Sequence, residues 1–175
     1  MSLRTRILIT TVLYGVFYVV GFPETANNEK NDKWAGFRDL KWGDDIKGIT
    51  GMVLIDEDGD DKLYKRPTDD LFIGEAQLHN IEYLFYKDRF WAVVIKIIGY
   101  SNFEALKNAT DATFGIGYRS NKYIEEYFWF HEGITMGLQY NEFNKTGELH
   151  IINNALSNER ENDKKEKAKE AYKDF

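Results

Sequence analysis

The chain has 175 residues, with 23 lysines and arginines against 29 aspartates and glutamates, a net charge of -6 at pH 7 and no cysteine. Because basic residues are interleaved with acidic ones, the sequence offers no basic stripe that could displace counterions from a nucleic acid, and nucleic-acid binding is not expected. Without cysteine, neither a disulfide nor a thiol nucleophile is available, so a hydrophobic core must hold the fold.

The N-terminal segment has the layout of a secretory signal. Residues 7–22 form a nearly uninterrupted apolar run that follows Arg4 and Arg6, and the chain then turns polar. The run is shorter than the roughly 20 apolar residues of a spanning helix. We therefore expect residues 1–26 to be a signal peptide that directs the protein to the periplasm or the extracellular space, followed by a polar lead-in over 27–33. A retained membrane anchor is the alternative.

A single domain is expected over residues 34–156. In its first half, Asp44 stands where a helix N-cap would, and apolar side chains recur at three-residue steps from Ile46 to Met52, which predicts a short helix. Alternating patterns predict strands after it, at 62–66, 76–86 and 89–98, the last two joined as a β-hairpin.

The second half repeats this order of elements. Ser101 and Glu104 form a capping box in the sequence, so a second helix is predicted to begin there and to end at Gly115. Three strands are predicted after it, at 123–131, 134–141 and 148–153. The expected fold class is α+β, an antiparallel β-sheet with two helices on one face in a tandem α-β-β-β arrangement.

Residues 157–175 form a charged C-terminal tail rich in asparagine, glutamate, lysine and aspartate. Two interpretations are open for this tail. It is either a frayed, solvated helix or a helix that docks on the domain through Tyr172 and Phe175.

The chain contains four distinctive segments, FRDLKWG at 37–43, the aromatic hairpin at 83–91, GYSNF at 99–103 and YFW at 127–129. Together they resemble a group of small exported bacterial proteins without an assigned activity that share an FRxLxWG-type opening. In element order the chain is also similar to the tandem helix-plus-sheet fold of the β-lactamase inhibitor protein and of the lipoproteins of the barrel-assembly machinery. It lacks the disulfides of the former and the lipid-attachment cysteine of the latter, so the resemblance implies a fold and no function.

Two patterns could suggest a metal site, and neither has the required spacing. In the acidic run at 56–61, Asp61 stands where an EF-hand loop needs glycine, so we interpret the run as a solvated turn, with calcium ligation as the alternative. The three histidines, His79, His131 and His150, fall on different predicted strands. No metal ligand and no cofactor is assigned.

No catalytic residue is assigned either. Glu125 and Glu126, near Glu132, could suggest paired carboxylates for acid–base catalysis, but alternation along a strand sends the first two to opposite faces. A hydrolase of envelope material that uses carboxylates near Glu125, Glu126 or Glu132 remains an alternative function. It requires that their side chains meet in a concave pocket.

Two predicted strands are apolar on both faces. On 89–98, Phe90, Ala92, Val94 and Ile98 are expected on one face, and Trp91, Val93, Ile95 and Ile97 on the other. On 123–131, Ile124, Phe128 and Phe130 are expected opposite Tyr123, Tyr127, Trp129 and His131. If helices cover one face, the other presents an aromatic surface that could bind a partner, unless the tails, sheet curvature or a second copy covers it.

The sequence therefore predicts an exported, non-enzymatic binding module that recognises another protein through an aromatic sheet face. A purely structural homodimer is a further alternative, and no stable membrane span is expected unless the signal is retained. The candidate partner-binding residues are Tyr127, Trp129, Tyr123, Gln139 and Trp91.

Overall fold

The computed structural model describes residues 9–11, 17–19 and 33–171, and the chain divides into two compact units, residues 1–32 and 33–175. In the first unit, β1 (Ile9–Thr11) pairs antiparallel with β2 (Phe17–Val19). The other residues of the predicted signal peptide, and the lead-in up to residue 32, lie outside the described residues. None of the helices in the described part of the chain has both the length and the hydrophobicity that a membrane span needs.

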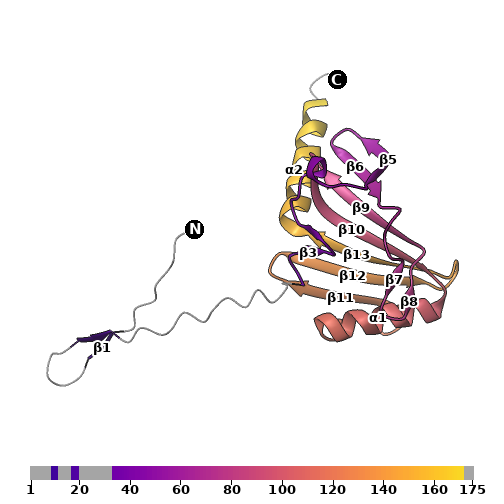
Figure 1. Cartoon of the computed structure of the whole chain (residues 1–175), viewed down its shortest axis with the longest axis horizontal. Helices are drawn as coiled ribbons and strands as arrows, with labels where there is room; N and C mark the ends of the chain where they lie inside the picture. The colour runs from indigo at the N-terminus through magenta and orange to yellow at the C-terminus, as the bar shows by residue number, and fades with distance from the viewer. Residues whose placement is uncertain (1–8, 12–16, 20–32, 172–175) are drawn as a thin grey trace. The chain divides into compact units, whose positions relative to one another are not determined.

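The second unit is built on a seven-stranded antiparallel sheet in the order β11-β12-β13-β10-β9-β6-β5 (Figure 1). Lys87 and Asp88, both with positive φ, form the tight turn that joins β9 to β10, which confirms the predicted hairpin. The strands are β5 (Val53–Asp58), β6 (Asp61–Lys65), β9 (Asn80–Tyr86), β10 (Arg89–Ile98), β11 (Glu126–His131), β12 (Ile134–Asn141) and β13 (Thr146–Asn153). Two small ladders flank this sheet, β3 (Gly36–Phe37) with β4 (Leu40–Lys41) and β7 (Phe72–Ile73) with β8 (Ala76–Gln77).

The prediction of a short α-helix after Asp44 is wrong. The structure has only a three-residue 3₁₀ helix, η1 (Ile46–Gly48), whose N-cap is Asp45 and not Asp44. The cause is local, because the chain turns at Gly51, where φ is +79°, and then enters β5. The acidic run at 56–61 accordingly belongs to the hairpin of β5 and β6, with its turn at Gly59.

The second predicted helix is confirmed as α1 (Tyr100–Phe114), although its start differs. The N-cap is Gly99, so Ser101 lies inside the first turn and makes no cap hydrogen bond. At the other end Gly115 is the C-cap as predicted, with φ +91° and its N–H donating to the carbonyl of Asp111 at 2.9 Å. The α-β-β-β order is therefore present once, in the second half of the chain.

The main hydrophobic core lies between one face of the sheet, α1 and the N-terminal strap, by which we mean residues 33–43. Phe103 and Leu106 of α1 are fully buried in this core, and Trp42 of the strap stacks on Phe90 with ring centroids 4.8 Å apart. A shift of register between Phe90 and Ala92 marks a β-bulge in β10. Because of this bulge, Phe90 joins Val93, Ile95 and Ile97 in the core, while Trp91 lies with Ala92 on the other face, contrary to the simple alternation expected from the sequence.

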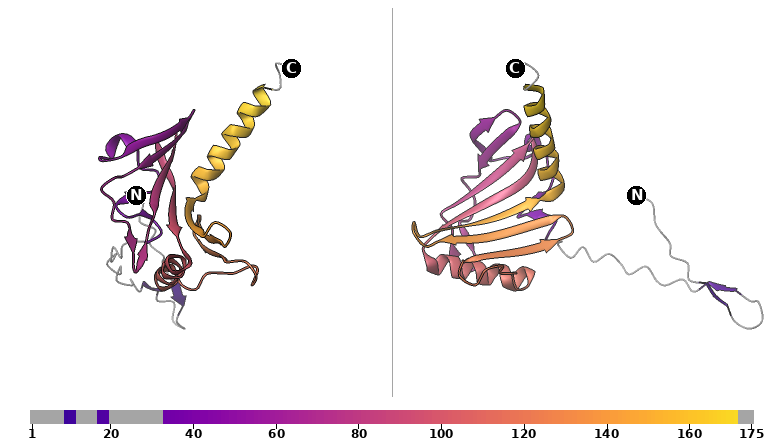
Figure 2. Two further views of the ribbon diagram at one scale, coloured as in Figure 1. Left: turned by 90° about the vertical axis from the view of Figure 1, so that its right-hand side faces the viewer. Right: turned by 180° about the vertical axis from the view of Figure 1, so that it is seen from behind.

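The C-terminal segment forms a second long helix, α2 (Asn154–Ala171), on the face opposite the strap (Figure 2). Leu156 packs there against a small cluster of Tyr86, Trp91 and Ala92. The fold is thus mixed α+β, as predicted, but the arrangement of two helices on one face is not confirmed, since α1 and α2 pack against different clusters. Tyr172 and Phe175, the predicted docking residues of the tail, lie outside the described residues.

Candidate binding face

The strand register places the side chains of the face opposite α1 in three rows. The first row is mainly apolar and contains Phe130, Thr135, Ile152, Ala92 and Leu84. Only its Ile152, Ala92 and Leu84 end packs with Leu156 of α2. The second contains Phe128, Gly137, His150, Val94 and Glu82. The third is polar and contains Glu126, Gln139, Glu148, Lys96 and Asn80.

Helix α2 covers only one part of this face. Figure 2 shows it over the strands β9, β10 and the end of β13, whereas β11 and β12 carry no helix on this side. We call the uncovered part the open face and define it by Glu126, Phe128, Phe130, Thr135, Gly137, Gln139, Glu148 and His150.

Three of the predicted partner-binding residues are buried in the domain itself, which contradicts their placement on an exposed face. Tyr127 is 9% and Trp129 4% exposed, and both belong to the main core with α1. Trp91 is 8% exposed and lies below α2, where the Arg160 guanidinium stacks 5.1 Å from its ring centroid. Helix α1 packs on the Tyr127 and Trp129 side of β11, and alternation alone could not show which side the helix would take.

The core position of Trp129 is fixed by the loop after α1. Its indole Nε1 donates to the carbonyl of Gly115 at 2.7 Å, and Gly117 passes directly over the ring. A Cβ at Gly117 would lie 2.6 Å from the Trp129 ring, closer than carbon atoms can approach, so this position requires glycine. Asp111 holds the loop in place by accepting from the Gly117 N–H at 2.9 Å.

Tyr127 is held in a similar way. Its hydroxyl donates to Glu125 at 2.7 Å, and the Lys107 ammonium lies 4.7 Å from its ring centroid. Burial, reinforced by the hydrogen bond to Glu125, raises the pKa of Tyr127 to about 12. Glu125 also pairs with Arg119 at 2.8 Å, so its carboxylate is committed to this cluster.

On the other side of β11 lie the alternate aromatic residues Phe128, which is half-buried, and Phe130, which is exposed. Their rings stack with centroids 6.1 Å apart at an interplanar angle of 14°, and Phe130 is 65% exposed. Phe128 lies over Gly137 of the neighbouring strand, where a Cβ would be 3.3 Å from the ring. Glycine at this position therefore lets the Phe128 ring lie close to the sheet.

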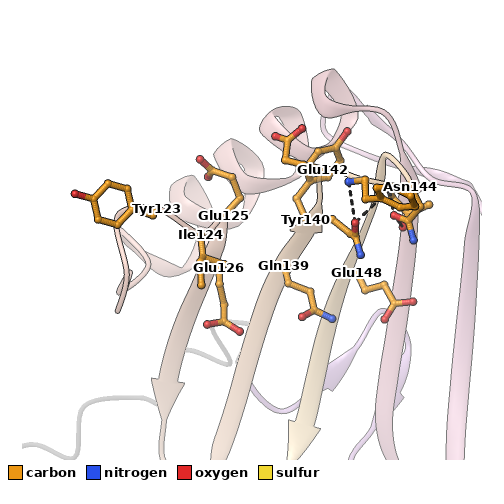
Figure 3. Close-up of a pocket in the computed structure, with 12 residues that line it drawn as sticks. Tyr123, Ile124, Glu125, Glu126, Gln139, Tyr140, Glu142, Asn144 and Glu148 are labelled. Carbon is orange, nitrogen blue, oxygen red and sulfur yellow. Dashed lines mark hydrogen bonds between the residues drawn. The ribbon is translucent and has the colours of Figure 1, made fainter.

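A concave region of about 670 Å³ lies at the ends of β11, β12 and β13, beside the open face. Figure 3 shows Glu126, Gln139 and Glu148 pointing to one side of the sheet, while Glu125 points to the other. Tyr123, 83% exposed, and Gln139 are the two predicted contact residues that the structure leaves accessible, and both line this region. Its remaining lining residues are Ile124, Tyr140, Asn141, Glu142, Phe143, Asn144 and Thr146.

The region is acidic. Its lining contains four glutamates and no lysine or arginine. Glu142 pairs with Lys145 at 2.9 Å and Glu148 with His150 at 3.1 Å. The side chain of Glu126 makes neither a hydrogen bond nor an ion pair among the described residues, so its charge is available to a ligand.

The three carboxylates considered for a hydrolase do not come together in one site. Glu125 and Glu126 both line the concave region but point to opposite sides of the sheet (Figure 3). Glu132 lies in the turn between β11 and β12, at the opposite end of β11. Within the part of the chain that the structure describes, no group of three histidine, aspartate or glutamate side chains could hold a metal ion.

Comparison of the chain with protein-family models, with curated proteins and with solved structures finds no match. The open face must therefore be interpreted from its own residues. Sequence reasoning missed Phe128 and Phe130 as contact residues. The signal that could have found them is Gly137, an isolated glycine in an otherwise well-formed strand, which indicates that a neighbouring side chain lies over it.

Proposed function

We propose that this protein is an exported, non-enzymatic binding module that recognises another protein through the open face. The observation that carries the proposal is the stacked pair Phe128 and Phe130, held on a helix-free part of the sheet beside an acid-lined concavity. Exposed aromatic rings next to polar rows are typical of protein-binding surfaces, because a ring contributes a large contact area at a small cost in side-chain entropy.

The charges on and around the open face define the chemistry of the partner. Glu126 lies in one polar row with Glu148, and the rings of Phe128 and Phe130 lie in the two neighbouring rows, which run parallel to it. A partner segment that alternates lysine or arginine with apolar side chains would bring its charges to the carboxylates and its apolar groups to the rings. The net charge of -6 adds a long-range attraction for such a segment.

A defined peptide tests this proposal. The probe is a labelled ten-residue peptide of alternating lysine and valine, with alternating glutamate and valine as its control, and binding is followed by fluorescence anisotropy. Only the basic peptide is expected to bind, and Phe130→Ala and Glu126→Lys should each weaken it by about tenfold or more. The control variants Phe72→Ala, at a half-exposed ring on the strap side, and Glu75→Lys, at the exposed turn between β7 and β8, should bind like the unmodified protein.

Two results would exclude the proposed surface. One is equal binding of the acidic and basic peptides, and the other is full affinity in both open-face variants. A self-associating protein in light scattering would instead favour the homodimer, in which a second copy covers the open face.

We further propose that the protein acts in the periplasm or outside the cell. The support is the apolar run 7–22 with its preceding arginines, a pattern typical of cleaved export signals. Expression of the full chain in bacteria, followed by fractionation and N-terminal sequencing, tests this. The mature protein is expected outside the cytoplasm and to start at Asn27, whereas an intact N-terminus in the soluble cytoplasmic fraction would contradict it.

A further inference from the structure

A second site, separate from the open face, lies inside the strap side of the domain. A cavity of about 270 Å³ extends between the N-terminal strap, β7, one side of α1 and the sheet. Its floor is aliphatic and comes from three adjacent strands, through Ile95, Ile134, Leu149 and Ile151. Its walls are mainly aromatic and contain Trp34, Phe37, Trp42, Phe72, Ile73 and Phe114.

The hydroxyl groups and the Trp42 indole in the cavity walls already have hydrogen-bond partners within the protein. The Thr110 hydroxyl donates to the carbonyl of Leu106 at 2.8 Å, and the Thr113 hydroxyl donates to that of Ala109 at 2.8 Å. The Trp42 indole donates to the carbonyl of Trp34 at 2.7 Å. A ligand inside this cavity would therefore be recognised by its apolar body and not by hydrogen bonds from these groups.

The size of the cavity sets the size of the ligand. An apolar cavity of about 150 Å³ can already hold benzene, and this one is larger. A methylene group fills roughly the 30 Å³ that one water molecule occupies in the liquid, so the cavity accommodates a chain of about nine carbon atoms.

The rim of the cavity carries a positive charge. Lys33 is exposed there and makes its contacts with the backbone carbonyl of Thr113 and with the face of the Phe114 ring, 5.3 Å from the centroid. Among the described residues, no carboxylate pairs with Lys33. Arg38, the other cation of the lining, is instead engaged by Asp69 at 2.9 Å. An anionic group at the end of an apolar chain would complete the charge pairing of Lys33.

We propose that this cavity binds a medium-chain aliphatic carboxylate, with the chain between strap, helix and sheet and the carboxylate at Lys33. Binding of this ligand would not use the open face, so it is independent of the function proposed above.

Calorimetric titration of the full-length protein with alkanoates of increasing length tests whether the cavity binds the alkyl chain. Affinity should rise about fourfold for each added methylene, hence about fifteenfold from hexanoate to octanoate, and should stop rising near nine carbons. The proposal would be overturned if octanoate did not bind, or if the affinity did not change with the number of carbon atoms in the alkanoate.

Variants locate the site. Ala109→Phe fills the cavity and should abolish octanoate binding, whereas Ala112→Phe, at an exposed position of the same helix, should leave it unchanged. Because Ala109→Phe could also disturb folding, Thr113→Trp at the exposed rim provides a second obstruction, and thermal melts of each variant report folding. Full octanoate affinity in a folded Ala109→Phe or Thr113→Trp protein would overturn the proposed position.

The head group is tested separately. Lys33→Gln should weaken octanoate at least about fivefold and leave octanol unchanged, because only the carboxylate loses its partner. Equal affinity of octanoate for both proteins would overturn the assignment of Lys33.

Discussion

Successive aromatic side chains of β11 have opposite environments. Trp129 is 4% exposed, is hydrogen-bonded to Gly115 and is covered by Gly117, whereas Phe130, the next residue, is 65% exposed. The same strand therefore supplies both core packing and surface contacts, and the pleat separates the two roles.

Alanine substitution should distinguish these roles. Trp129→Ala leaves a cavity and an unpaired Gly115 carbonyl, and should lower the free energy of unfolding by about 3–5 kcal/mol. Phe130→Ala removes mainly solvated area and should change it by less than about 1 kcal/mol. Urea denaturation measures both. A loss for Phe130→Ala as large as that for Trp129→Ala would show that Phe130 is a core residue.

The two-sided apolar character of β11 could be predicted from the alternation in the sequence, but the side that remains exposed could not. That side depends on where α1 packs, and the helix position follows from long-range contacts of Phe103 and Leu106. Trp91 was misplaced for a different reason, because the bulge in β10 shifts the pattern by one residue and periodicity does not reveal it.

At the scale of elements, α2 is attached mainly by charged groups. Arg160 and Lys164 both contact Asp61 at the start of β6, and Asp163 accepts from the hydroxyl of Tyr86 at 2.6 Å. Leu156 supplies an apolar contact near the start of the helix. The sequence indicated a charged segment that could be helical, but the partners of its charges lie about 70 to 107 residues away along the chain and could not be identified from local pattern.

Arg160 is the central residue of this attachment, since it pairs with Asp61 and stacks on Trp91. Arg160→Gln should lower the free energy of unfolding by about 1 kcal/mol and should increase the solvent exposure of Trp91. Lys165→Gln is the matched control, because Lys165 is exposed on the same helix. Hydrogen exchange of the α2 amides is the measurement, and equal protection in the two variants would contradict the attachment through Arg160.

The attachment should also depend on pH. Burial opposes ionisation of Asp61, but hydrogen bonds from Arg160 and Lys164 outweigh it and lower its pKa below the usual 3.8. Hydrogen bonds from Lys87 and Tyr86 lower the pKa of Asp163 in the same direction. A carboxylate whose pKa is lower in the folded than in the unfolded protein stabilises the docked helix when the pH is above its unfolded pKa. This stabilisation is lost as the pH falls through its folded pKa.

Docking of α2 should therefore be complete at pH 7 and weaken below about pH 4, while the main core persists. The NMR resonance of the Trp91 indole N–H reports this change, because Trp91 lies below Arg160. A resonance that does not move between pH 7 and pH 3 would show that the ion pairs do not hold the helix.

At the scale of the whole molecule, the sheet ends at β5 on one side and at β11 on the other. Val53, Leu54 and Ile55 of β5 are each about half exposed, which would favour edge-to-edge association. The next three residues, Asp56, Glu57 and Asp58, place like charges along the same edge strand. The edge of β11 is partly paired by Tyr118, which exchanges two backbone hydrogen bonds of 2.8 Å with Phe128.

These charges predict that residues 27–175 are monomeric at neutral pH. Neutralising the edge with Asp56→Asn and Asp58→Asn should increase self-association, because the apolar part of β5 is then no longer protected. Multi-angle light scattering measures the mass of both proteins. A stable dimer of the unmodified protein would instead support the structural homodimer.

The most direct test of the account is to map which side of β11 a ligand contacts. In an NMR titration with the lysine–valine peptide, the largest shifts are expected at Phe128, Phe130, Gly137 and Glu126, with the indole of Trp129 nearly unchanged. Chemical-shift changes centred on Tyr127, Trp129 and α1, with no change at the open face, would contradict the claim that the helix-free side of the sheet is the binding surface.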